Sequence, residues 1–340
     1  MLDQYGRKIT YLRISITDRC NLRCRYCMPD GVTDVGMKNI LTFEEIWEIV
    51  KLGVSLGITH IRITGGEPLV RKGCVDLIRG IRAIPGVETI TMTTNGILLR
   101  TYATALKEAG LDGLNVSLDT LDSEEFMMLT GRQNLAEVLD GIQAAKKVKI
   151  PIKINAVNQT GLNPILLAQY AEQERIPLRF IEMMPVGYGK KYVGRNNDEL
   201  RSCLEDAFGT SEMVESFSMG SGPAVYYQFP KLTIPVGFIS AIHGKFCDSC
   251  NRVRLTAQGY LKSCLCYDKG IDLRQILREG EVAERAQNEK NVQRMQNTQK
   301  ALNEQLTAAM KAAIYKKPAA HCFEHPEEMT EIHEMVKIGG

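Results

Sequence analysis

The strongest constraint on the fold of this chain is an alternation of strand-like and helix-like segments through residues 1–185. Short runs rich in β-branched residues predict strands at 10–16, 59–63, 88–92, 113–118, 151–157 and 178–181. Amphipathic stretches predict helices at 42–55, 71–84, 98–108, 134–147 and 163–174. Such alternation is typical of a parallel sheet. Six units, two short of a closed (β/α)8 barrel, predict an α/β fold with a partial (βα)6 TIM-like barrel; a doubly wound sheet has the same periodicity.

Nearly all the unusual residues of this region lie where the expected strands end. Three cysteines follow the first strand, Gly65-Gly66-Glu67-Pro68 the second and Thr93-Thr94-Asn95-Gly96 the third. Ser117 and Asp119 end the fourth strand, and residues 182–184 follow the sixth. Barrel enzymes build their active sites from the loops at the carboxyl ends of the strands. The pattern therefore favours a barrel-like enzyme.

The three cysteines, Cys20, Cys24 and Cys27, have C-x3-C-x2-C spacing in a polar, arginine-rich loop. A structural zinc site takes four protein ligands, whereas a [4Fe–4S] cluster takes one thiolate for each iron. Three thiolates leave one iron open, where S-adenosylmethionine (SAM) can bind through its amino and carboxylate groups and be cleaved reductively. The loop resembles the signature of the radical SAM family. The alternatives are a zinc site with a distant fourth ligand and three unrelated core cysteines.

A second group of three cysteines, Cys247, Cys250 and Cys264, has C-x2-C-x13-C spacing. It again offers three thiolates and an open position, which favours a second Fe–S cluster. Zinc is the alternative, with Cys266 as the fourth ligand. His243 is interpreted as a surface or packed residue rather than a ligand. The isolated cysteines, expected to be plain thiols, are Cys74, Cys203 and Cys322.

Arg252 and Arg254 lie two residues apart in a strand-like run, so their side chains share one face. Two guanidinium groups beside a metal site can grip an anion bidentately; a solvated strand edge is the alternative. Further arginines around the first cysteine loop are Arg13, Arg19, Arg23 and Arg25. This charge suits a substrate with several negative charges. We expect no nucleic-acid partner, because aromatic residues are only 6% of the chain and form no stripe among basic ones.

The composition sets the broad class of protein. The chain has 340 residues, enough for one large domain or a large and a smaller one, and a net charge of +2. Its ten cysteines are clustered, which indicates metal binding rather than disulfides. It has neither a run of about 18 apolar residues nor a signal-peptide pattern, so we expect a cytoplasmic protein with no membrane span.

Beyond about residue 190 the alternation stops. Three β-rich runs follow at 224–229, 232–240 and 252–256, and a long polar stretch at 272–314 predicts one or two exposed helices. We expect residues 1–215 to form the barrel core. Residues 216–340 are expected to form a smaller C-terminal domain that holds the second cluster and ends in Gly339-Gly340.

Four features in this order resemble the GTP 3′,8-cyclase (MoaA) family of radical SAM enzymes. They are the loop ending in Cys27-Met28-Pro29, the Gly65-Gly66-Glu67-Pro68 stretch, the second cysteine group around residues 251–255, and Gly339-Gly340. The resemblance covers essentially the whole chain. It implies that Cys20, Cys24 and Cys27 hold the SAM-binding cluster. It also implies a second [4Fe–4S] cluster, whose open iron binds the guanine of GTP, on Cys247, Cys250 and Cys264.

The resemblance also implies roles for residues outside the two cysteine groups. The implied SAM contacts are Tyr26, Gly66, Glu67, Ser117 and Met184. The implied GTP contacts are Arg13, Arg62, Thr93, Lys153, Arg252 and Arg254. Catalytic roles are implied for Arg252, Arg254, Gly339 and Gly340. The assignment of Lys153 leaves two alternatives. Its alternation with Ile152 and Ile154 suits either the barrel lumen or the outer, helix-covered face.

The implied reaction begins with one-electron cleavage of SAM to methionine and a 5′-deoxyadenosyl radical. This radical takes hydrogen from C3′ of GTP, the ribose radical attacks C8, and reduction gives (8S)-3′,8-cyclo-7,8-dihydroguanosine 5′-triphosphate. This is the first step of molybdenum cofactor biosynthesis. The implied partners are a flavodoxin- or ferredoxin-like reductant and cyclic pyranopterin monophosphate synthase, with a homodimer left open. The alternatives are another radical SAM enzyme with an auxiliary cluster and a zinc-stabilised nucleic-acid-binding module.

Overall fold

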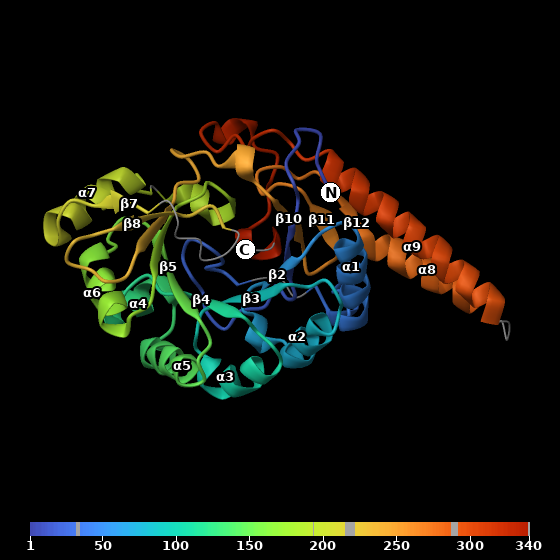
Figure 1. Ribbon diagram of the computed structural model, residues 1–340, viewed down its shortest axis with the longest axis horizontal. Coiled ribbons are helices and arrows are strands. Elements are labelled where there is room, and N and C mark those ends of the chain that lie inside the picture. The colour runs from blue at the N-terminus through green and yellow to red at the C-terminus, as the bar shows by residue number, and fades with distance from the viewer. Residues whose placement is uncertain (32–34, 193, 215–221, 287–291, 339–340) are drawn as a thin grey trace.

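The computed structural model describes residues 1–31, 35–192, 194–214, 222–286 and 292–338. Six parallel strands pair in chain order. They are β1 (Tyr11–Ser15), β2 (His60–Thr64), β3 (Thr89–Thr94), β4 (Gly113–Ser117), β5 (Ile152–Asn158) and β6 (Leu178–Glu182). The helices between them are α1 (Phe43–Ser55), α2 (Cys74–Arg82), α3 (Leu99–Glu108), α4 (Ser123–Thr130), α5 (Leu135–Lys147) and α6 (Pro164–Glu174), with α6 joining β5 to β6. Figure 1 shows these helices around the outside of a crescent of strands, so the predicted partial (βα)6 barrel is confirmed.

Two helices lie where the sequence pattern predicted none, α4 and α7 (Asn197–Phe208). In α4, the helix is capped by the preceding residue, Asp122, whose carboxylate accepts hydrogen bonds from N–H groups of the first turn. Its two methionines, Met127 and Met128, are exposed rather than buried. The pattern of apolar residues in the sequence therefore does not show which side of this short helix is buried.

Alternation along each strand separates a helix-covered face from a lumen face. In β3, Ile90 and Met92 have no exposed surface and belong to the hydrophobic core between strands and helices. Thr93 lies on the opposite face and lines a central cavity. Polar residues on alternate positions of the strands therefore face the lumen, where they can meet a ligand.

The sheet continues beyond the six expected strands on both sides. β9 (Val236–Ile239) pairs parallel with β6, and β10 (Arg252–Leu255) pairs parallel with β1. Antiparallel strands flank these two; they are β7 (Glu212–Met213), β8 (Val225–Gln228), β11 (Tyr260–Lys262) and β12 (Gly270–Asp272). Strands from residues 212–272 are thereby added to both edges of the six-stranded parallel sheet.

The polar stretch after β12 forms two helices, α8 (Leu273–Ala286) and α9 (Val292–Tyr315), which project from the barrel as a pair (Figure 1). The expectation that this stretch is exposed is wrong near the barrel. There, Met310 and Ile314 of α9 have no exposed surface, and Arg278 of α8 forms a 2.7 Å ion pair with Glu45 of α1. The sequence pattern predicted exposure along the whole stretch because most of the residues between these anchoring contacts are polar.

Candidate active site

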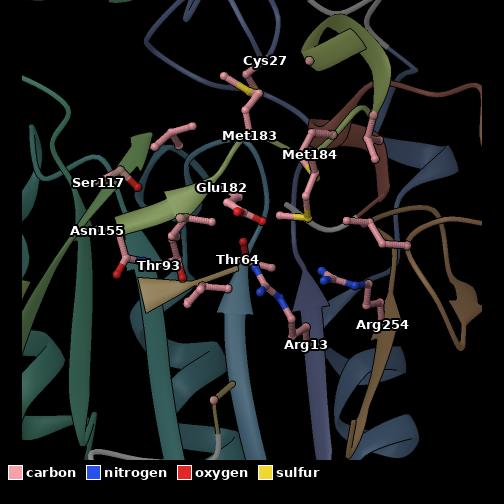
Figure 2. A pocket seen from close by; sticks show the side chains of 18 of the residues that line it. Arg13, Cys27, Thr64, Thr93, Ser117, Asn155, Glu182, Met183, Met184 and Arg254 are labelled. Carbon is pink, nitrogen blue, oxygen red and sulfur yellow. The ribbon is translucent and has the colours of Figure 1, made fainter. Parts of the chain in front are cut away.

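A cavity of about 360 Å³ lies at the carboxyl ends of the barrel strands and contains most of the residues singled out in the sequence (Figure 2). Both cysteine groups line it. The predicted site residues in its wall are Cys20, Cys24, Cys27, Cys247, Cys250, Cys264, Tyr26, Gly66, Ser117, Met184, Arg13, Arg62, Thr93, Arg252 and Arg254. Glu67 and Lys153 are not in this wall. Gly339 and Gly340 lie outside the described residues.

The first cysteine group lies on a tight turn after β1, in which the N–H groups of Cys27 and Met28 donate to the carbonyl of Cys24 at 3.0 and 2.9 Å. Burial raises the pKa of the Cys20 thiol to about 11 and that of Cys27 to about 12. The pKa of Cys24 is also raised, by burial and then by the Cys27 sulfur. Thiolates form in such a place only with a compensating cation, which suits metal ligation.

The two kinds of metal site considered for these cysteines place their ligands differently. Within the described ranges, no three Cys, His, Asp or Glu side chains converge on a point that one metal ion could occupy. The thiolates of a [4Fe–4S] cluster each bind a different iron, so they surround the cluster. A zinc site would instead bring its sulfur ligands to about 2.3 Å from one ion.

The loop after β2 packs against the first cysteine loop. A Cβ on Gly66 would lie 2.3 Å from the carbonyl oxygen of Arg19, so only glycine fits there. Glu67 is 1% exposed; its carboxylate accepts hydrogen bonds from Thr94 Oγ1 at 2.8 Å and the N–H of Asn95 at 2.7 Å. Burial raises the pKa of Glu67 to about 7. Glu67 thus joins the loops after β2 and β3 from behind the cavity wall.

Asp119 was noted in the sequence only as a residue at a strand end, and the structure gives it a specific contact. The Tyr26 hydroxyl donates to Asp119 Oδ2 at 2.8 Å, and the N–H of Val157 donates to Oδ1 at 2.8 Å. Burial raises the pKa of Asp119 to about 6. Asp119 therefore fixes the ring of Tyr26 and adds a carboxylate to the cavity wall. Its place at the end of a predicted strand was the available signal.

Arginines from neighbouring strands meet on the lumen face. Arg13 of β1 is in register with Arg62 of β2 and with Arg254 of β10. Burial, and then repulsion from Arg254, holds the pKa of Arg13 well below its usual range. Burial, and then repulsion from Arg252, lowers the pKa of Arg254 to about 10. Figure 2 shows the side chains of Arg13 and Arg254 pointing into the same region of the cavity. Such a concentration of positive charge favours a polyanionic ligand.

Lys153 lies in β5, two residues before Asn155, which lines the cavity. The two side chains share a strand face, so Lys153 faces the lumen rather than the helices. Burial, and then repulsion from Arg179 and Arg62, lowers the pKa of Lys153 to about 7. Arg179 was missed in the sequence although it lines the cavity; an arginine inside an apolar strand was the signal.

The second cysteine group brackets β10 and β11. Cys266 is buried; its Sγ lies 3.2 Å from Cys322 Sγ, and it is not in the cavity wall. Cys322 is a free cysteine, and although it is isolated in the sequence it lies beside Cys266, because the chain after α9 returns to this site. Cys266 thus lies outside the cavity wall that contains Cys247, Cys250 and Cys264. His243 is bound to Glu182, with 2.8 Å between Nδ1 and Oε1, and is also absent from the wall.

Charge around Cys250 differs from that around the first group. Burial alone would raise the pKa of the Cys250 thiol, but Lys317 and Arg252 lower it to about 7. Lys317 is buried and lines the cavity. It was not predicted from the sequence, in which it is one of two adjacent lysines after a polar helical stretch.

An open parallel barrel with a three-cysteine loop after its first strand defines a radical SAM enzyme. A model of the radical SAM superfamily matches residues 14–172, and a model described as Molybdenum Cofactor Synthesis C matches residues 176–323. SuiB of Streptococcus suis, bound to S-adenosylmethionine, shares the fold with a TM-score of 0.64 and 14% identity, covering 97% of this chain and 77% of that one.

Curated relatives narrow the class. A GTP 3′,8-cyclase of Petrotoga mobilis is 46% identical over 81% of this chain and 86% of that protein. One of Clostridium perfringens strain SM101 is 39% identical over 100% of both chains, and one of Moorella thermoacetica is 40% identical over 98% of this chain and 99% of that one. The chain belongs to the GTP 3′,8-cyclase family. In the described part of the chain, no helix has the length and apolar character needed to span a membrane.

Proposed function

We propose that the cavity carries out the reaction of this family, the conversion of GTP into (8S)-3′,8-cyclo-7,8-dihydroguanosine 5′-triphosphate for molybdenum cofactor biosynthesis. The observation that carries the proposal is that two three-cysteine groups and closely spaced arginines line one cavity. A radical reaction needs its radical source within reach of the substrate, and a triphosphate needs concentrated positive charge.

The first cysteine group would hold the [4Fe–4S] cluster that binds SAM. When bound, that cluster and SAM supply a 5′-deoxyadenosyl radical through one-electron cleavage of SAM. The residues of this chain would orient SAM and exclude water: Tyr26, Gly66, Ser117 and Met184 contribute the neighbouring wall. Glu67 would act indirectly, since its carboxylate is occupied by the loops after β2 and β3.

Cys247, Cys250 and Cys264 would hold the second [4Fe–4S] cluster, with the guanine of GTP at its open iron. Arg13, Arg62, Arg252 and Arg254 would bind the triphosphate, and Thr93 and Lys153 would complete the GTP site. Support comes from the register that joins the arginines of three adjacent strands into one cationic surface. GTP bound across this surface is held at one end through its base and at the other through its phosphates, which fixes its ribose.

Gly339 and Gly340 are proposed to assist cyclisation through backbone groups and the terminal carboxylate. Support comes from the burial of the residues just before them. Val336 and Ile338 are 1% and 2% exposed, and Met335 lines the cavity. We further propose that a flavodoxin- or ferredoxin-like protein supplies the electron and that the product passes to cyclic pyranopterin monophosphate synthase. A homodimer, a domain boundary at residue 215 and a cytoplasmic location are also proposed.

The test is anaerobic incubation of the reconstituted protein with GTP, SAM and dithionite, followed by mass analysis. The product should be an isomer of GTP, because the hydrogen atom lost from C3′ is replaced by an electron and a proton at the base. It should form with one 5′-deoxyadenosine and one methionine, and ATP should give no such product. Cleavage of SAM without a GTP isomer would refute the proposal and favour a radical SAM enzyme with another substrate.

A further inference from the structure

Lys317 places a buried ammonium group in the wall of the second cysteine site. The residue is 3% exposed, and Nζ donates a hydrogen bond to the carbonyl of Arg252 at 2.9 Å and another to the carbonyl of Ser263. Arg252 lies two residues after Cys250, and Ser263 directly precedes Cys264. One cation therefore joins the two segments that carry these cysteines.

The position of Lys317 is set from outside the site. Its backbone N–H donates to the carbonyl of Ile314 at 3.2 Å, at the end of α9. Ile314 and Met310 have no exposed surface and anchor α9 against the barrel. The buried end of α9 thus holds Lys317 in place beside the cavity.

Lys317 differs from two nearby buried cations in lacking a carboxylate partner among the described residues. Arg7 is paired with Asp3 at 2.6 Å, and Lys262 is paired with Glu331. Among the residues that the structure describes, Lys317 has no carboxylate partner; its ammonium bonds two carbonyls, and its third N–H is left for the Cys250 sulfur. A buried cation without a counter-charge is unfavourable unless an anion occupies the neighbouring space.

We propose that Lys317 is a positioning residue of the second cluster. It holds the segments of Cys250 and Cys264 at the spacing the cluster needs, and its charge stabilises the cluster's reduced, more negative state. The physical basis is that net charge and hydrogen bonds to sulfur set the reduction potential of such clusters. The proposal rests on the proposed function, because it takes Cys247, Cys250 and Cys264 to be cluster ligands.

The experiment compares Lys317→Met and Lys317→Arg with a matched control, Lys316→Met, which removes the adjacent, exposed lysine. Each protein is reconstituted anaerobically and its iron is counted. The second cluster is then titrated potentiometrically and followed by electron paramagnetic resonance. A variant with Cys20, Cys24 and Cys27 changed to Ala identifies the second cluster's signal. In Lys317→Met we expect a more negative midpoint potential for the second cluster only, and in Lys317→Arg a value close to that of the unmodified protein.

Each outcome decides the proposal. Loss of the second cluster in Lys317→Met but not in Lys317→Arg would also support it, because the cation is then required. Equal iron content and equal potential in Lys317→Met and Lys316→Met would overturn it. Loss of the cluster in both position-317 variants would overturn the role of charge. An unmodified protein without the second cluster would refute the proposed function itself, and that result would be known before any substitution is compared.

Discussion

At the scale of single residues, Arg13 of β1 and Arg254 of β10 combine burial in the cavity wall with mutual repulsion. That combination is unfavourable in the empty cavity and becomes favourable when an anion is bound. Arg252 also makes a cation–π contact, since its guanidinium lies 4.9 Å from the centre of the Phe246 ring. Substitution of these arginines therefore tests whether the ligand is a polyanion.

Changing Arg252 or Arg254 to Ala should weaken GTP binding by about 1.5–3 kcal/mol, roughly 10- to 150-fold in Kd, as expected for a charge-assisted hydrogen bond. Both clusters should be retained. Isothermal titration of GTP into each variant measures the effect. Arg100→Ala, at an exposed residue of α3, is the control and should leave Kd unchanged. Unchanged affinity in both site variants would mean that the two arginines form only a solvated strand edge.

Lys153 should make GTP binding depend on pH. Its pKa of about 7 means that the ammonium loses its proton as pH rises through neutrality. An anion binds the protonated form better, so affinity should fall from pH 6 to pH 8.5 by roughly tenfold. The phosphates of GTP also titrate, so the measurement is the slope of log Kd against pH relative to Lys153→Arg, whose side chain stays charged. Parallel slopes in the two proteins would exclude Lys153 from the site.

At the scale of elements, the short turn Met335–Ile338 fastens the end of the described chain to the first cysteine site. A hydrogen bond from the backbone of Val336 reaches the Cys27 sulfur, and the two buried side chains of the turn anchor it. A segment tied down in this way can present whatever follows it at a defined place. The end of the described chain is therefore held beside the first cysteine group.

Deleting Gly339 and Gly340 should leave folding, iron content and SAM cleavage largely intact, because the anchoring residues remain. Formation of the GTP isomer should fall by more than tenfold, since backbone groups and the carboxylate are lost from the reacting region. The measurement is the ratio of GTP isomer to 5′-deoxyadenosine. A deletion variant with the unmodified ratio would show that the two glycines have no part in cyclisation.

At the scale of the whole molecule, the second cluster site and the substrate site are completed by chain that returns to the barrel. β10 pairs with β1, and residues after α9 close the cavity beside Cys247. His321, for instance, donates its backbone N–H to Cys247 Sγ at 3.4 Å. The C-terminal region is therefore part of the same active site as the barrel.

The reconstituted protein should contain about eight irons and a similar amount of sulfide, because each cysteine group holds one four-iron cluster. Cys24→Ala should lose about half of the iron and all SAM cleavage. Cys250→Ala should lose the other half and the GTP isomer, while some SAM cleavage continues. Cys203→Ala, in α7 away from the cavity, is the control and should keep all of the iron. One zinc and no sulfide would contradict both clusters.

The sequence by itself determined the features that depend on local spacing. Strand–helix alternation predicted the barrel, because the period of apolar residues reflects local burial. The cysteine groups were also recognisable, because ligands within one short loop are held together by the chain itself, and the polar residues at strand ends indicated which edge carries the site.

Only the tertiary structure decided which distant residues become neighbours. In the fold, Arg254 lies beside Arg13, and Lys153 faces the lumen. Glu67 lies behind the cavity wall, and Lys317 lies next to Cys250. The physical reason is that strand order and register set contacts across a sheet, and local periodicity carries no information about either. Burial and repulsion, which shift the pKa values of these groups, arise only when the neighbours have been assembled.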